Sequence, residues 1–329
     1  MRMILNTLLP FAFTASAIAA DPWLVFDTKD GERNGKHVVL ISGDEEYRSE
    51  EAFPMLGRLL AEKHGFKCTV LLPINKETGE IDPNEQTNIP GLQNLDSADF
   101  VILGLRFREL ADAEMKHFVD YVESGKPLLG LRTSTHAFNY TRSKKSPYAS
   151  WSFNSSEWPG GFGKQVLGET WVNHHGDHGK QSTRGIKSRE NRDHPLLSGV
   201  KEVWGPTDVY GVRKLPEDAT PLLYGQVLAG MSPDDPPAEG EKNEPMMPIA
   251  WVRKRELENG KIQHVICSTM GAATDFEKQG LRKFVVNSAL WACGLPVNET
   301  LDVEPIGDYQ PSSFGFNGFK KGVKVDDLR

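Results

Sequence analysis

Four short apolar runs, each closed by a polar turn, dominate the chain between residues 37 and 131. They are short and almost continuously apolar, which is typical of strands buried on both faces of a sheet. Amphipathic segments with helical spacing follow the first and third runs. This alternation predicts an α/β fold with a doubly wound, mostly parallel sheet. The four runs are residues 37–42, 67–72, 99–104 and 127–131.

Two stretches without a helical or strand period interrupt the chain after residue 138. Residues 140–186 are rich in serine, glycine and aromatic side chains, and residues 230–248 are rich in proline and glutamate. We expect both to be insertions that form lid loops on a single α/β domain at residues 21–298. Residues 299–329 have no clear period and are expected to form a C-terminal extension. Between and after the insertions lie strand-like runs at residues 203–212, 221–228, 248–253 and 262–269, and a last helix at residues 281–293.

The first 20 residues have the pattern of a secretory signal peptide. Arg2 is followed by a mostly apolar stretch that ends in Ala17-Ile18-Ala19, an A-x-A cleavage pattern. An uncleaved anchor is the alternative. No later segment reaches the roughly 18 apolar residues that cross a bilayer. We therefore expect an exported protein, periplasmic or secreted, with no membrane attachment after cleavage.

Composition and charge narrow the range of partners. Of the 329 residues, 38% are hydrophobic and 25% are charged, which is typical of a globular protein. The net charge is −7, and no Lys/Arg cluster is long enough to follow a phosphate backbone, so nucleic acid is excluded as a partner. A homo-oligomer is left open.

The run at residues 127–131 ends abruptly in Arg132, two hydroxyl side chains and His136, which predicts a strand-to-helix elbow. In open α/β sheets, ligands bind at the carboxyl ends of such strands. A glutaminase or cysteine peptidase would need a thiolate at this turn, but Arg132 stands two residues after Gly130 and none of the three cysteines is near. Ser134 lacks the G-x-S-x-G frame of a nucleophile and is better explained as a helix cap.

Arg132 and His136 are the first candidate catalytic residues. A guanidinium at this place can hold a carboxylate or stabilise developing oxyanion charge. The alternative is a structural ion pair with Glu45 or Glu46, which follow the first apolar run. His136 lies one helical turn beyond Arg132, where an imidazole can serve as acid or base.

Residues 173–179, NHHGDHG, hold the densest group of titratable side chains. We name His175 and His178 as candidate catalytic residues for acid–base or hydrogen-bonding work. We expect no bound metal, although His174, His175 and His178 are the set that could ligate one. Asp208, between turn residues and an aromatic run, is a further candidate base or substrate ligand. It can equally be an ordinary turn aspartate.

Five other residues are candidates for binding substrate. Glu46 and Tyr47 follow the first apolar run, and Arg106 follows the third, so all three should reach the same edge of the sheet. Trp151 and Trp158 lie in the first insertion, where aromatic rings suit stacking on the C–H faces of sugars.

Several motifs, in their order along the chain, resemble the trehalose-utilisation (ThuA-like) family, in particular a secreted bacterial subgroup. The resemblance covers roughly residues 36–296 and rests on GLRTSTHAF, RDHPLLSGV, VWGPTDVYGV, PIAWVRKRELENGKIQHVICSTMG and VVNSALWACG. It implies a flavodoxin-like fold of the class I glutamine amidotransferase type and a sugar-related substrate. Where this family commonly has a histidine after the Gly-Leu of the elbow, this chain has Arg132.

Together these observations favour an enzyme that acts on a keto-sugar or oxidised glycoside by acid–base chemistry, without a cofactor. Isomerisation, elimination and hydrolysis stay open, with His175 or His178 as base and Arg132 as stabiliser of the oxyanion. One alternative is a non-catalytic carbohydrate-binding protein on an amidotransferase-like scaffold. The other is a metal-dependent hydrolase that uses the loop at residues 174–178.

Overall fold

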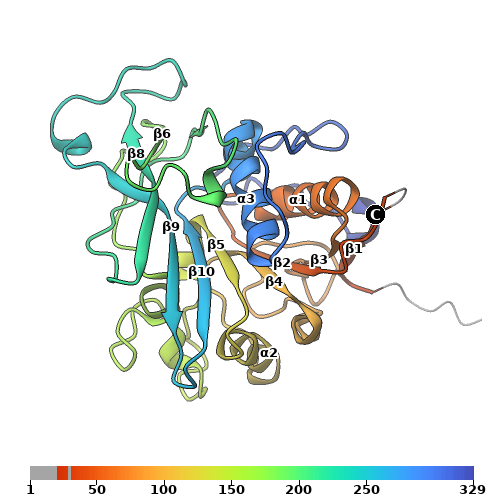
Figure 1. Ribbon diagram of the computed structural model, residues 1–329. Helices are drawn as coiled ribbons and strands as arrows, with labels where there is room; N and C mark the ends of the chain where they lie inside the picture. Colours follow the sequence, from red (N-terminus) through yellow and green to blue (C-terminus); the bar gives the residue numbers. More distant parts are fainter. Residues whose placement is uncertain (1–20, 29–30) are drawn as a thin grey trace, which may run out of the picture.

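The computed structural model describes residues 21–28 and 31–329, and the predicted signal peptide at residues 1–20 lies outside them. The three α-helices of the described residues are α1 (Ser49–His64), α2 (Asp112–Glu123) and α3 (Gln279–Ala292). The strands are β1 (Leu24–Phe26), β2 (His37–Gly43), β3 (Lys67–Leu71), β4 (Phe100–Leu105), β5 (Leu128–Leu131), β6 (Thr183–Lys187), β7 (Trp204–Gly205), β8 (Ala219–Val227), β9 (Met247–Glu256) and β10 (Ile262–Ser268). They form one ten-stranded sheet in the order β1-β3-β2-β4-β5-β10-β9-β8-β6-β7 (Figure 1).

The centre of the sheet is parallel. Strands β3, β2, β4, β5 and β10 run in one direction, so the runs that end at Ser42, Gly104 and Leu131 are neighbours. This confirms the predicted α/β fold. Strands β9, β8, β6 and β7 extend the sheet in antiparallel fashion, and β1 pairs antiparallel with β3. The antiparallel half arises because its strands are joined without intervening α-helices.

Helices cover both faces of the parallel strands, which explains why those strands are apolar throughout. Figure 1 shows α1 and α3 on one side of the sheet and α2 on the other. Val38 and Leu40 of β2 pack in the core under α1 and α3, whereas Val39 and Ile41 pack in the core under α2. Within the described residues, no helix is both long and apolar enough to cross a membrane.

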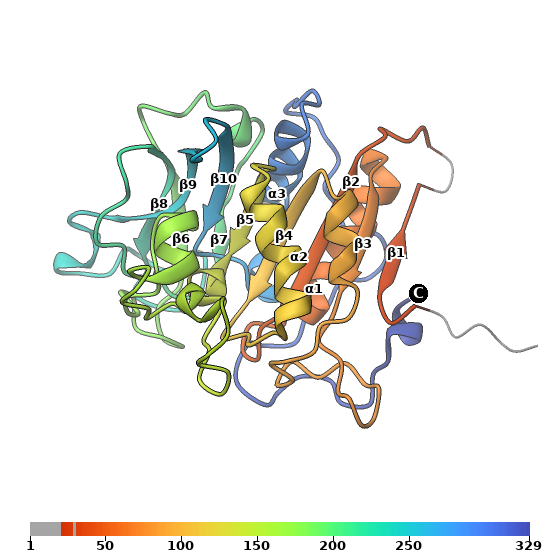
Figure 2. The same cartoon turned by 90° about the horizontal axis from the view of Figure 1, so that it is seen from below.

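The last residues of the chain return along the edge where the parallel strands end. Val303 and Val325 are buried, and the amide of Ile81 donates a hydrogen bond of 2.8 Å to the carbonyl of Val323. Arg329 donates to the carbonyl of Asp21 near the other end of the described chain. Figure 2 shows this dark blue segment running along the lower edge of the sheet and ending near β1.

Candidate functional site

The predicted elbow is present where β5 passes directly into a short 3₁₀ helix, η2 (Arg132–His136). Arg132 has a φ of 42°, in the left-handed region that residues other than glycine rarely adopt. Two hydroxyls hold the turn in place: Ser134 donates to the carbonyl of Leu103 at 2.9 Å, and Thr133 donates to the Asp44 carboxylate. Ser134 is fully buried, so its hydroxyl has a structural role rather than an exposed nucleophilic one.

The Arg132 side chain is buried, and both of its terminal nitrogens donate hydrogen bonds to the protein. Its Nη1 donates to the carbonyls of Asp208 (2.7 Å) and Thr269 (2.9 Å). Its Nη2 donates to Asp208 Oδ1 (2.9 Å) and to the Tyr47 hydroxyl (3.2 Å). The guanidinium also lies between two aromatic rings, 4.5 Å from the centre of Tyr47 and 3.9 Å from that of Tyr210. The ion-pair partner of Arg132 is thus Asp208, not Glu45 or Glu46, and the guanidinium positions that carboxylate.

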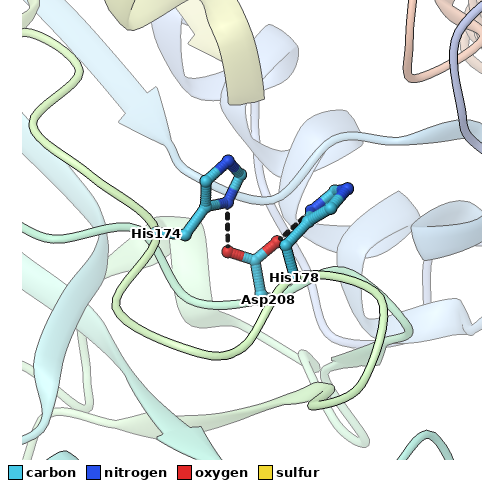
Figure 3. Close-up of side chains that lie close together, drawn as sticks. All are labelled: His174, His178 and Asp208. Atoms are coloured by element: carbon cyan, nitrogen blue, oxygen red, sulfur yellow. Dashed lines mark hydrogen bonds and ion pairs between the residues drawn. The ribbon is translucent and has the colours of Figure 1, made fainter.

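Asp208 connects Arg132 to two histidines of the loop at residues 173–179. His174 Nδ1 lies 2.7 Å from one carboxylate oxygen, and His178 Nδ1 lies 3.0 Å from the other (Figure 3). Although burial by itself raises the pKa of a carboxyl, the Arg132 guanidinium and the His174 hydrogen bond hold the pKa of Asp208 well below its usual range. An ionised carboxylate only accepts hydrogen bonds, so both Nδ1 atoms carry a proton.

The histidine loop is fixed by backbone contacts with the segment that carries Asp208. His174 and Tyr210 form an isolated antiparallel bridge, and the amides of His175 and Gly176 donate to the carbonyl of Val209. A side chain at Gly176 would lie 3.2 Å from the Asp208 Cβ, tighter than an ordinary contact. Glycine therefore lets the loop approach closely enough for two imidazoles to reach one carboxylate.

The two histidines differ in what their second ring nitrogen meets. In Figure 3 the Nε2 atoms of His174 and His178 point away from Asp208. His178 Nε2 lies 3.2 Å from Glu46 Oε1, whereas Nε2 of His174 has no hydrogen-bond partner among the described residues. About a third of each histidine side chain is exposed, 35% for His174 and 37% for His178. His174 is therefore the partly exposed imidazole whose second ring nitrogen has no partner among the described residues.

Glu46 and His178 form a pair that can share a proton. Burial, followed by repulsion from the Asp44 carboxylate, raises the pKa of Glu46. A carboxyl 3.2 Å from an imidazole nitrogen can pass a proton to it or accept one from it. Glu46 comes from the loop after β2 and His178 from the loop before β6, so the pair joins the parallel and antiparallel halves of the sheet.

Arg132, Asp208, His174, His178 and Glu46 form one cluster of contacting polar side chains. His136 lies beside this cluster but is not in its hydrogen-bond network. It is buried, and its Nδ1 lies 3.2 Å from the Thr135 hydroxyl. Its ring packs against those of Trp171 (5.7 Å between centres) and Tyr210 (6.3 Å). Burial, reinforced by the Arg106 and Arg132 cations, holds the pKa of His136 well below its usual range, so the ring is neutral.

The other predicted site residues have different positions. His175 Nε2 lies 2.7 Å from the carbonyl of Lys242 in the second insertion, away from Asp208. Trp151 and Trp158 pack on each other, and Trp151 stacks on Phe162 in the core under α2. No hydrogen bond, ion pair or ring contact in the described part of the chain joins these two tryptophans to the cluster.

Two predicted binding residues lie around the cluster. Tyr47 is buried under Arg132, and burial raises the pKa of its hydroxyl to about 12. Arg106 is partly exposed, with its Nη1 3.4 Å from Glu45 Oε2 and its guanidinium over the ring of Phe107 at 4.4 Å. Arg106 thus presents a cation near the surface, whereas Tyr47 is a buried support.

Three side chains of the cluster also match a metal-binding geometry. His174, His178 and Asp208 each offer one ligand atom, and these atoms lie within 4.8 Å of one another. Two imidazole nitrogens and one carboxylate oxygen are a donor set that zinc accepts. His175 is not part of this set. The Arg132 guanidinium, 2.9 Å from the same carboxylate, opposes a second cation there.

Comparison with known proteins gives one informative likeness. No protein-family model matches the chain, and no curated protein does. The solved structure of a protein of Parabacteroides merdae described as ThuA-like matches with a TM-score of 0.54 and 14% identity over 84% of this chain and 99% of that chain. A ThuA-like protein of Bacteroides uniformis matches with a TM-score of 0.46 and 15% identity over 80% and 94%. The ThuA-like resemblance holds at the level of the fold.

Sequence reasoning placed His174 only in the metal alternative and did not single out Tyr210. Both residues lie within motifs already singled out from the sequence. A glycine-rich loop has no helical or strand period, however, so the sequence does not show which of two adjacent histidines faces the site. Tyr210 could have been found from the VWGPTDVYGV motif, because it follows the candidate residue Asp208 by two positions.

Proposed function

We propose that this protein is a sugar-related enzyme that acts on a keto-sugar or oxidised glycoside by acid–base chemistry, with His174 as the base. The observation that supports this most directly is the Arg132–Asp208–His174 arrangement. A buried, ionised carboxylate fixes the Nδ1 proton of His174 and leaves its Nε2 lone pair accessible. The same logic orients catalytic histidines in unrelated hydrolases.

The chemistry follows from the acidity of a C–H bond beside a carbonyl. His174 Nε2 takes that proton, and the bonding electrons move onto the carbonyl oxygen to form an enolate. Where the enolate carbon carries a hydroxyl, that hydroxyl proton moves to the former carbonyl oxygen, and return of a proton to the former carbonyl carbon shifts the carbonyl by one position. Where the β carbon carries an oxygen substituent, the electrons of the enolate expel it, and it leaves with a proton to give an α,β-unsaturated ketone. The Glu46–His178 pair supplies the proton for the departing or developing oxyanion. Arg132 acts through Asp208 as a positioning residue.

The proposed setting is outside the cytoplasm. The signal-like N-terminus supports export to the periplasm or medium, where a secreted ThuA-like protein would meet small carbohydrates. A small-molecule carbohydrate is the partner we propose, and the chemistry described needs no bound cofactor.

The decisive experiment compares two neighbouring histidines. We expect the protein to convert at least one member of a panel of 3-keto-glycosides, followed by mass spectrometry. His174→Ala should lower kcat/KM by about 10²- to 10⁴-fold, the usual contribution of a general base. His175→Ala is the matched control and should change it little, because its Nε2 faces the Lys242 carbonyl.

Two outcomes would reject this assignment. Unchanged turnover in His174→Ala, with the melting temperature of the wild type, would exclude His174 as the base. Saturable sugar binding by the wild type without any product would favour the non-catalytic carbohydrate-binding alternative.

A metal-dependent hydrolase is the second candidate, favoured by the convergence of His174, His178 and Asp208. A divalent ion there would supply an activated water. In that case dialysed protein should bind one equivalent of zinc by calorimetry, lose it in His178→Ala and keep it in His175→Ala. Under the metal-free proposal, turnover persists after treatment with a chelator.

A further inference from the structure

The C-terminal extension reaches the candidate site through a short segment around Gly315. The Gly315 amide donates to the carbonyl of Glu46 at 2.8 Å, and Arg48 donates from Nη2 to the carbonyl of Gly315. Arg48 is buried and also donates to the carbonyl of Glu46 at 3.2 Å. The extension is therefore tied to the backbone of a residue that belongs to the site.

Phe314 and Phe316, on either side of Gly315, project aromatic rings over site residues. The Phe314 ring lies 5.5 Å from that of Tyr47 and 5.6 Å from that of His178. The Phe316 ring lies under the Arg106 guanidinium at 4.9 Å. Phe314 thus contacts His178, and Phe316 contacts Arg106, so the segment on both sides of Gly315 borders these two residues.

Phe316 is unusual in its exposure. It is 56% exposed, and among the exposed large apolar side chains of the described residues it is the aromatic one: the others are Val25, Met231 and Ile262. A single exposed apolar side chain needs no functional explanation by itself, but an exposed aromatic ring beside polar groups can pack against a ligand. The Arg106 guanidinium lies over one face of the ring, and more than half of the side chain stays exposed.

The groups around Phe316 match the two sides of a pyranose ring. A sugar presents a C–H face that packs on an aromatic ring and hydroxyls that bond to charged or amphoteric side chains. Phe316 offers the aromatic face. Hydrogen-bonding groups come from Arg106, which contacts Phe316, and from Glu46 and His178, which contact the neighbouring Gly315 and Phe314. The segment is anchored through Arg48, so little conformational freedom is lost when a ligand binds.

We propose that Phe316, supported by Phe314, forms a stacking subsite that holds a pyranose ring of the substrate next to His178. This inference rests on the proposed function and deepens it, because it assigns a binding role to the C-terminal extension. Phe316 contacts substrate in the ground state and in the transition state alike, so its loss raises KM and leaves kcat almost unchanged.

The test measures KM and kcat for a 3-keto-glycoside that the wild type converts. Phe316→Ala should raise KM by about threefold to tenfold, the value of one aromatic stacking contact, with kcat within about twofold. Phe316→Tyr should restore the wild-type KM because it keeps the ring. Ile262→Ala, at a 51% exposed apolar residue where β10 begins, is the control and should behave as the wild type.

The outcomes separate this subsite from the proposed function. An active Phe316→Ala protein with the KM of Ile262→Ala overturns the subsite and leaves the function standing. A fall in kcat that Phe316→Tyr does not rescue also overturns it. A wild type that neither converts nor binds any sugar of the panel overturns the function, and the subsite with it.

Discussion

Arg132 combines a strained backbone with a buried charge. Its φ of 42° costs on the order of 1–3 kcal/mol for a residue with a side chain. The turn directs the guanidinium under the histidine loop, where four hydrogen bonds and two aromatic rings hold it. The residue expected to stabilise an oxyanion instead keeps Asp208 ionised, and Asp208 orients His174.

Arg132→Ala should destabilise the protein as well as inactivate it. The substitution leaves Asp208 as a buried carboxylate without its cation, a change that typically costs about 3–5 kcal/mol. Urea unfolding at pH 7 measures the loss. The double variant Arg132→Ala/Asp208→Asn should recover part of it, because the uncompensated charge is gone. A loss below about 1 kcal/mol in the single variant would contradict this role.

Helix α1 carries an unusual acid in its first turn. Both carboxyl oxygens of Glu50 are buried and have no hydrogen-bond partner in any other described residue. Burial raises the pKa of Glu50 from 4.5 to about 8, even though its own backbone hydrogen bond and Arg48 oppose the shift. The proton that Glu50 keeps in the folded state makes the stability of this end of the helix depend on pH.

In Glu50→Gln, the free energy of unfolding should decrease less steeply with rising pH than it does in the wild type. Because the folded pKa lies above the unfolded one, the native state binds the extra proton between pH 4.5 and about 8, and stability decreases across that window. The slope from this group is at most about 1.4 kcal/mol per pH unit. Urea unfolding at pH 5, 6.5 and 8 tests this, with Glu51→Gln as control. Parallel slopes for wild type and Glu50→Gln would refute it.

The site is formed by three parts of the chain that are far apart in sequence. The parallel half of the sheet supplies the elbow and Glu46, and the antiparallel half supplies the histidine loop and Asp208. The C-terminal extension closes the arrangement, since Arg48 and Gly315 are 267 positions apart. The extension is therefore part of the packed structure around the site.

Removing residues 306–329 should lower stability by more than about 2 kcal/mol, the value of burying one or two apolar side chains. The deletion removes buried Val325 and the 2.8 Å hydrogen bond from the Tyr309 hydroxyl to the Ala273 carbonyl. Urea unfolding of the shortened chain is the measurement. Unfolding curves that coincide with those of the full chain would show that the extension is not needed for stability.

The parallel half of the fold could be predicted from the sequence because its signal is local. A strand covered on both faces must be apolar at every position, as Val38 to Ile41 are, and the polar turn after it marks the edge where ligands bind. The same reasoning singled out Arg132, whereas the loop at residues 173–179 was singled out by its density of titratable side chains. These patterns report which residues are buried and where strands end.

Only the tertiary structure decided which side chains meet. His174 and His175 are adjacent in a loop without a period, and the bridge between His174 and Tyr210 determines that the first reaches Asp208, 34 positions away. From the sequence, Arg132 was expected to be free to bind substrate. In the folded chain it is buried and paired with that carboxylate. Phe316 had no local signal at all. Burial is an average property that local sequence encodes, whereas the direction of a contact depends on chain segments that meet only after folding.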